Sequence, residues 1–216
     1  MKTSFQGKDA KAAKRLLAVL LLATTGFAQK QQTAELIAAA GVFNGQEYSN
    51  PALGFSMLAP GGWSFYKAEQ NQAAVERNKQ NASQMRDARL ETSAAHTQVL
   101  FQAIPPSFGG QDKQAILSAG IEKLSSPTSA EKYAADQKTF VMGSANARIT
   151  RDIYSVTFGG VTFTAFDIEG TRKQGAYRHR YMMTVRRGIA LFIVATFFDD
   201  RQSGIVDASL RSMKFK

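Results

Sequence analysis

The segment 171–188, TRKQGAYRHRYMMTVRRG, combines a group of positive charges with interleaved tyrosines. Its basic residues are Arg172, Lys173, Arg178, Arg180, Arg186 and Arg187. Basic side chains gathered on one surface attract phosphate, sulfate and carboxylate groups. We therefore predict that these six residues bind an anionic partner: lipid, glycan, nucleic acid or an acidic protein.

The order of residues within this segment suits a β-strand, whose side chains alternate between two faces. Arg178 and Arg180 would then share one face. The other face would carry the rings of Tyr177, His179 and Tyr181. The alternative is an ordinary solvated sheet face on which the arginines pair across strands, for example with Asp167 or Glu169. The tyrosines suit a core position as well as a stacking platform.

Other residue types that could do chemistry lack the spacing that chemistry needs. The two histidines, His96 and His179, are far apart and form no metal-ligand pair. No cysteine is present, which excludes thiolate nucleophiles and thiolate metal sites. The Gly-x-Ser-x-Gly motif of serine hydrolases is absent as well. We predict no catalytic residues, no metal and no cofactor, and keep as the alternative a hydrolase whose site is assembled from dispersed residues.

Acidic residues near the end of the chain offer one more metal hypothesis. Asp199 and Asp200, with Asp207 nearby, could supply oxygen ligands to Ca²⁺. Their spacing matches no calcium-binding loop, and acids at the start of a helix are favoured by its dipole. We therefore predict a strand-to-helix turn at this position.

The N-terminal residues have the pattern of an export signal. Lysines and an arginine precede the apolar run LLAVLLLATTGFA, which is too short to span a membrane and ends in small residues. We predict a signal peptide over 1–28, a linker over 29–45 and a domain over 46–216 that is periplasmic or secreted and has no transmembrane segment after cleavage. The chain carries a net charge of +10, of which about +6 remains after residue 28. Such a charge favours anionic surfaces, but nucleic acid is not the expected partner.

Turn signals and hydrophobic periodicity place the elements of this domain. Short strands are expected on either side of Asn50-Pro51, followed by core positions for Trp63 and Phe65. A polar helical insertion follows over 67–95, then a strand over 96–104 and a helix over 111–124. Thr128 stands three residues before Glu131, the spacing of a capping box, which predicts a second short helix.

The last third of the chain is rich in strand signals. Gly159-Gly160 and the segment 186–188 read as tight turns, so the segment 147–198 predicts a four-stranded antiparallel meander. The segment SGIVDASLRSMKF then reads as a closing helix with a short tail.

The order of these elements, with the motifs NPALGFSMLAPGGW, VTFGGVTF and SLRSMKF, resembles the PsbP-like fold. That fold is shared by a photosystem II accessory protein, Ran-binding nuclear import factors and many exported bacterial proteins. The resemblance implies an α+β fold, an antiparallel sheet flanked by helices as an α/β/α sandwich. It also implies a non-catalytic domain that acts through its surface.

These observations together predict the function. We expect an exported binding or accessory module, not an enzyme, that acts through a sheet face or a neighbouring groove. Its partner would be a protein or an anionic component of the cell envelope. The alternatives are a periplasmic hydrolase and a binder of anionic polymers through the basic segment.

Overall fold

The computed structural model describes residues 41–66, 97–106, 113–124, 126–144, 147–172 and 175–216. The predicted signal peptide and the predicted insertion lie outside these residues. None of the helices within the described ranges is long and apolar enough to cross a membrane.

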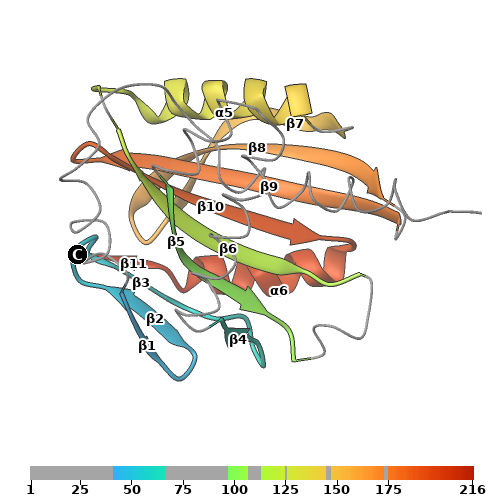
Figure 1. Ribbon diagram of the computed structural model, residues 1–216. Coiled ribbons are helices and arrows are strands. Elements are labelled where there is room, and N and C mark those ends of the chain that lie inside the picture. The colour runs from blue at the N-terminus through green and yellow to red at the C-terminus, as the bar shows by residue number, and fades with distance from the viewer. Residues whose placement is uncertain (1–40, 67–96, 107–112, 125, 145–146, 173–174) are drawn as a thin grey trace, which may run out of the picture.

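A seven-stranded antiparallel sheet forms the centre of the molecule (Figure 1). Its strands, in spatial order, are β4 (Ser64–Phe65), β5 (Thr97–Ile104), β6 (Ile116–Lys123), β10 (Ile189–Phe197), β9 (Gly175–Arg186), β8 (Val161–Arg172) and β7 (Ala147–Phe158). The last four follow one another in the chain as the predicted meander. Gly159 and Gly160, both with positive φ, turn the chain between β7 and β8, as the hairpin signal predicts.

A second, four-stranded sheet packs beside the first. It has the order β1 (Val42–Asn44), β2 (Glu47–Asn50), β3 (Phe55–Leu58) and β11 (Lys214–Phe215). The turn between β2 and β3 forms at Asn50-Pro51, as predicted, because the Asn50 side chain accepts a hydrogen bond from the Leu53 amide at 3.1 Å. Strand β1 lies within the segment 29–45 that the sequence assigns to a linker, and β11 is a strand that the sequence does not predict.

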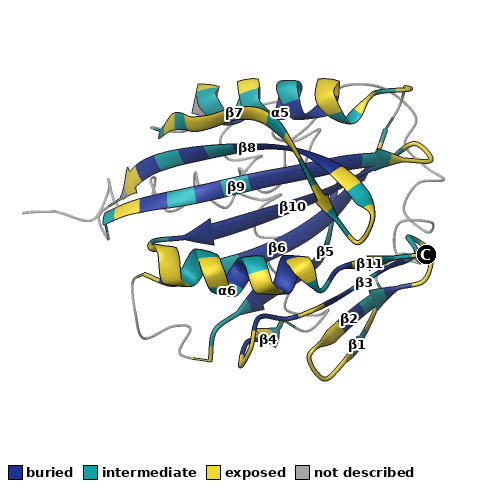
Figure 2. Ribbon diagram, turned by 180° about the vertical axis from the view of Figure 1, so that it is seen from behind, coloured by how far each residue is buried: buried dark blue, intermediate teal, exposed yellow. Residues whose placement is uncertain are grey.

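The two helices within the described residues lie on opposite faces of the large sheet (Figures 1 and 2). Helix α5 (Ala130–Ser144) packs against β7, β8 and β9, and α6 (Asp200–Arg211) packs against β10 and β3. This arrangement confirms the predicted α+β fold, a sheet flanked by helices. It also divides the hydrophobic core into two clusters, one on each face.

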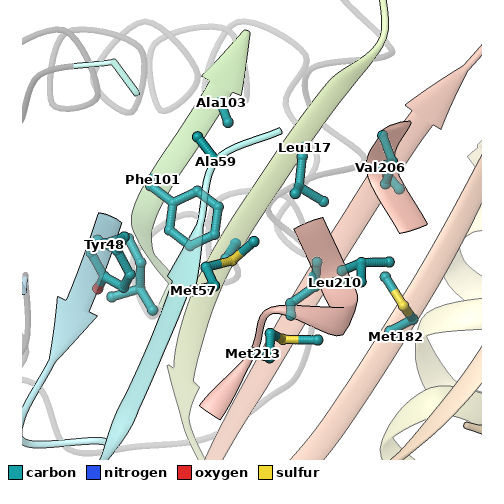
Figure 3. Close-up of a cluster of buried hydrophobic side chains, with 14 of the residues drawn as sticks. Tyr48, Met57, Ala59, Phe101, Ala103, Leu117, Met182, Val206, Leu210 and Met213 are labelled. Carbon is teal, nitrogen blue, oxygen red and sulfur yellow. The ribbon is translucent and has the colours of Figure 1, made fainter. Parts of the chain in front are cut away.

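The cluster on the α6 side joins the small sheet, the large sheet and the helix. Figure 3 shows Leu210 of α6 near Met57, Leu117 and Met182, which come from β3, β6 and β9. Trp63 belongs to the same cluster and is only 6% exposed, which confirms its predicted core position.

The structure has a strand, β6, where the sequence predicts a helix over 111–124, so that prediction is wrong. Its apolar residues suggest a helix because they do not alternate with polar ones. They do not alternate because both faces of β6 are buried from Leu117 to Glu122: Leu117 and Ile121 lie in the cluster on the α6 side, and Glu122 contacts α5 on the other side. Gly120 fits this position because a Cβ there would clash with the ring of Phe192 on β10.

Helix α5 begins one residue away from the predicted capping box. The cap is Ser129, whose side chain accepts a hydrogen bond from the Lys132 amide at 3.2 Å. Thr128 instead donates its hydroxyl to the carbonyl of Ser126 at 3.1 Å. The helix runs to Ser144, further than the short helix that the sequence predicts.

Candidate functional site

Two of the predicted basic residues hold α6 to the sheet. Because successive side chains of a strand point to opposite faces of the sheet, Arg178 and Arg180 of β9 both point toward the face that α6 covers. Arg178 Nη2 donates to Asp200 Oδ1 at 2.7 Å, and Arg180 Nη1 donates to Asp207 Oδ1 at 2.6 Å. Both guanidinium groups also lie over the ring of Phe197, at 4.9 and 5.8 Å from its centroid. These arginines are therefore committed to contacts between β9, β10 and α6.

The environment of Arg180 is the more buried of the two. Arg180 Nε lies 3.4 Å from Asp167 Oδ1, the cross-strand pair that the sequence offers as the alternative. The Tyr154 hydroxyl donates to the same Asp167 oxygen at 2.8 Å. Burial lowers the pKa of Arg180, but Asp167, Tyr154 and Asp207 together outweigh it, so the net pKa is raised. Burial and the neighbouring Asp167 likewise raise the pKa of Tyr154.

Arg186 and Arg187 are placed differently, at the far end of β9. At about 3.3 Å per residue, Arg186 is roughly 26 Å along the strand from Arg178. Arg187 and Gly188 form the two-residue turn into β10, and both have positive φ, 52° and 75°. Arg186 and Arg187 are both exposed, and the Arg186 guanidinium lies 5.7 Å from the ring centroid of Phe215. Of the two remaining predicted residues, Arg172 ends β8 without a described side chain and Lys173 lies outside the described residues.

The structure therefore brings the predicted basic residues together only in part. Arg178 and Arg180 lie at one end of β9, and Arg186 and Arg187 lie at the other. Whether any of them binds an anionic partner stays a prediction.

The opposite face of β9 is aromatic and buried. Tyr177, His179 and Tyr181 are 2–4% exposed. His179 Nδ1 lies 2.9 Å from the Thr196 hydroxyl, and the ring of Tyr181 stacks on Phe166 at 4.7 Å. The sequence leaves open whether the tyrosines are core residues or an exposed stacking platform. The structure shows that they are core residues.

Two groups of residues escape sequence reasoning. Glu122 of β6 is 1% exposed and accepts a hydrogen bond from the Tyr133 hydroxyl of α5 at 2.7 Å. Burial and the Glu122 charge raise the pKa of Tyr133 well above its usual value. The assignment of β6 to a helix hides this pair, because only a strand places Glu122 beneath α5.

The second group lies at the C-terminal strand. Lys214 and Lys216 are exposed on either side of Phe215, whose ring contacts Phe163 and the Arg186 guanidinium. We call Arg186, Arg187, Lys214 and Lys216 the basic tip. The sequence analysis names Arg186 and Arg187 but not the two lysines, because the pairing of β11 with β3 is not visible in the sequence.

The three aspartates considered as calcium ligands, Asp199, Asp200 and Asp207, instead make contacts within α6 or between α6 and β9. Asp199 caps the helix by accepting a hydrogen bond from the Gln202 amide at 2.8 Å, as the predicted strand-to-helix turn requires. Asp200 and Asp207 pair with the arginines of β9. Within the described part of the chain, no group of three metal-binding side chains is found. His96 lies outside that part.

A comparison with one solved structure supports the architecture. No protein-family model and no curated protein matches the chain. Among solved structures, cyanobacterial PsbP (CyanoP) from Synechocystis has 16% sequence identity and a TM-score of 0.50, covering 82% of this chain and 98% of its own. LpqN from Mycobacterium tuberculosis, described as involved in cell envelope biogenesis, has 11% identity and a TM-score of 0.49, covering 75% and 83%. The chain thus has a PsbP-like fold, which confirms the resemblance in the sequence.

Proposed function

We propose that this protein is an exported accessory module that has no catalytic activity of its own and acts by binding another component of the cell envelope. The observation that carries the proposal is that the side chains most able to do chemistry are engaged in contacts within the fold. Arg180, His179 and Glu122 each have a partner within the fold, and each helps to join a strand to a neighbouring layer or strand. The charged side chains of the basic tip, in contrast, lie at the surface.

The compartment is part of the proposal. The basic and apolar pattern over 1–28 supports export to the periplasm or beyond. Mass spectrometry of the mature protein from its native host should find an N-terminus near residue 29. An intact Met1 would contradict the export step.

Binding can be tested by site-specific photocrosslinking in living cells. Crosslinking residues would replace Thr157 on β7, Lys132 on α5 and Arg187 at the basic tip, three exposed positions on different surfaces. We expect a defined adduct from one surface and none from the others. No adduct from any of them, together with hydrolytic turnover that one substitution abolishes, would replace the module by the hydrolase alternative.

A further inference from the structure

The exposed basic residues that the structure describes differ in whether they have an acidic partner. Lys132 of α5 and Arg148 of β7 form the pairs Lys132–Asp136 and Arg148–Glu169, whereas Arg151 of β7 and Arg201 and Arg211 of α6 are exposed without an ion pair to another described residue. Among all ion pairs between described residues, none involves Arg186, Arg187, Lys214 or Lys216. The basic tip is therefore a concentration of positive charge that the described part of the fold does not neutralise.

The four residues gather from two distant parts of the chain. Arg186 ends β9 and Arg187 begins the turn into β10, whereas Lys214 and Lys216 flank Phe215 of β11. The contact between the Arg186 guanidinium and the Phe215 ring joins the two parts. Figures 1 and 2 place this turn and the C-terminal strand at the same end of the molecule. Lys123 of β6, also exposed, lies in the same row of the sheet, opposite Ile189, which in turn pairs with Arg186.

The backbone at Arg187 is a second, independent observation. This turn requires positive φ at both central residues, and Asn or Gly normally takes the first of them. Here an arginine adopts φ 52° instead, which is unfavourable for a long side chain. Strained residues are held by the surrounding structure and cluster at functional sites.

We propose that the basic tip docks the protein on the anionic phospholipid headgroups of an envelope membrane. This inference rests on the proposed function and deepens it by naming the surface and the chemistry of its partner. A turn with long cationic side chains can meet a flat layer of phosphates without a complementary groove. Binding of this kind is weak, reversible and sensitive to salt.

The test is sedimentation of the purified protein with lipid vesicles. Wild type should bind vesicles that contain phosphatidylglycerol, should bind less at high salt, and should not bind pure phosphatidylcholine. In the variant Arg186→Glu/Arg187→Glu/Lys214→Glu, affinity should fall about a hundredfold or more, because each of the three basic residues contributes about fivefold near an anionic membrane. All proteins compared would carry the same mature N-terminus.

A matched control separates the tip from net charge. Lys132→Glu/Arg148→Glu/Arg201→Glu changes the charge by the same amount at exposed positions on α5, β7 and α6. This control should keep nearly wild-type binding. Equal losses in the two variants would overturn the proposal, since charge alone would then explain binding. If the first variant unfolds, the neutral set Arg186→Gln/Arg187→Gln/Lys214→Gln replaces it.

Other outcomes are distinguishable from failure of the proposed function. Absence of vesicle binding, with a protein crosslink at Arg187 that persists, would overturn the lipid partner in favour of an acidic protein and leave the accessory function standing. Retention on heparin without vesicle binding would reassign the tip to anionic polymers. Absence of vesicle binding and of every crosslink would overturn both proposals.

Discussion

Arg178 and Arg180 stand two residues apart on the same face of β9, yet their surroundings differ. The side chain of Asp200, the partner of Arg178, is 93% exposed, whereas that of Asp207, the partner of Arg180, is 31% exposed. Exposed ion pairs contribute little to stability, because solvent screens them and ordering the side chains costs entropy. Removing one partner of a buried ion pair destabilises a protein more, because it leaves a charge unpaired away from solvent.

We therefore expect Asp207→Asn to lower the free energy of unfolding by about 1–2 kcal/mol, the half-buried pair being only partly screened. Asp200→Asn is the matched control and should leave stability unchanged within error. Urea denaturation of both variants measures the difference. Equal effects would contradict the assignment of Arg180 as the buried link between β9 and α6.

Arg187 allows stability and binding to be separated at one residue. Arg187→Asn places a residue that tolerates positive φ in the turn, so stability should rise by about 0.5–1 kcal/mol. Binding to anionic vesicles should fall in the same variant, because a charge of the basic tip is lost. Thermal unfolding and vesicle sedimentation test the two effects. A variant with unchanged stability would show that the turn stores no strain.

Tyr48 predicts how stability depends on pH in the alkaline range. Burial is the main cause that raises its pKa from 10.0 to about 12, and a hydrogen bond from Asn50 partly opposes it. The native state thus holds this proton more tightly than the unfolded state. The resulting stability is complete below pH 10, where the unfolded chain is still protonated, and is lost as pH rises toward 12.

We expect the unfolding free energy to fall across this window, with a smaller fall in Tyr48→Phe. The slope should not vanish, because burial also raises the pKa values of Tyr133 and Tyr154. Urea denaturation at several pH values tests the expectation. An identical slope in wild type and variant would exclude Tyr48 as a source.

At the scale of elements, the small sheet depends on its C-terminal strand. Phe215 of β11 stacks on Phe55 at 5.2 Å, and the Lys216 amide donates to the Gly54 carbonyl at 2.8 Å. The Ser209 hydroxyl of α6 also donates to the carbonyl of Leu58 at the end of β3. These contacts tie the last residues of the chain to its first described strands.

Phe215→Ala should therefore destabilise the fold by about 1–3 kcal/mol, less than for a fully buried phenylalanine because the side chain is half-buried. Lys214→Ala, one residue earlier and exposed, is the control and should change stability little. Denaturant titration of the two variants provides the measurement. A neutral Phe215→Ala would mean that β11 adds nothing to the small sheet.

The elements that the sequence predicts are those with a local signal. Glycines with positive φ mark the β7–β8 hairpin, and alternation places Arg178 and Tyr177 on opposite faces of β9. The prediction of a helix in place of β6 is wrong because burial on both faces of the strand removes the alternation of apolar and polar residues. Strand β11 was missed because its partner β3 lies more than 150 residues away in the chain.

At the scale of the whole molecule, sequence reasoning identified the basic segment but not its division. The segment looks continuous in the sequence, while the fold pairs Arg178 and Arg180 with acids of α6 and leaves Arg186 and Arg187 beside the C-terminal lysines. This pairing depends on tertiary contacts between β9 and α6, whose register no local pattern specifies. The surface expected to bind is accordingly the basic tip, at one end of the layered fold.

Hydrogen–deuterium exchange in the presence of phosphatidylglycerol vesicles tests this division most directly. If the basic tip docks on the membrane, amides around Arg186–Ile189 and Lys214–Lys216 should gain protection, and those around Arg178–Arg180 should not change. Protection centred on Arg178 and Arg180, or spread evenly over the molecule, would contradict it.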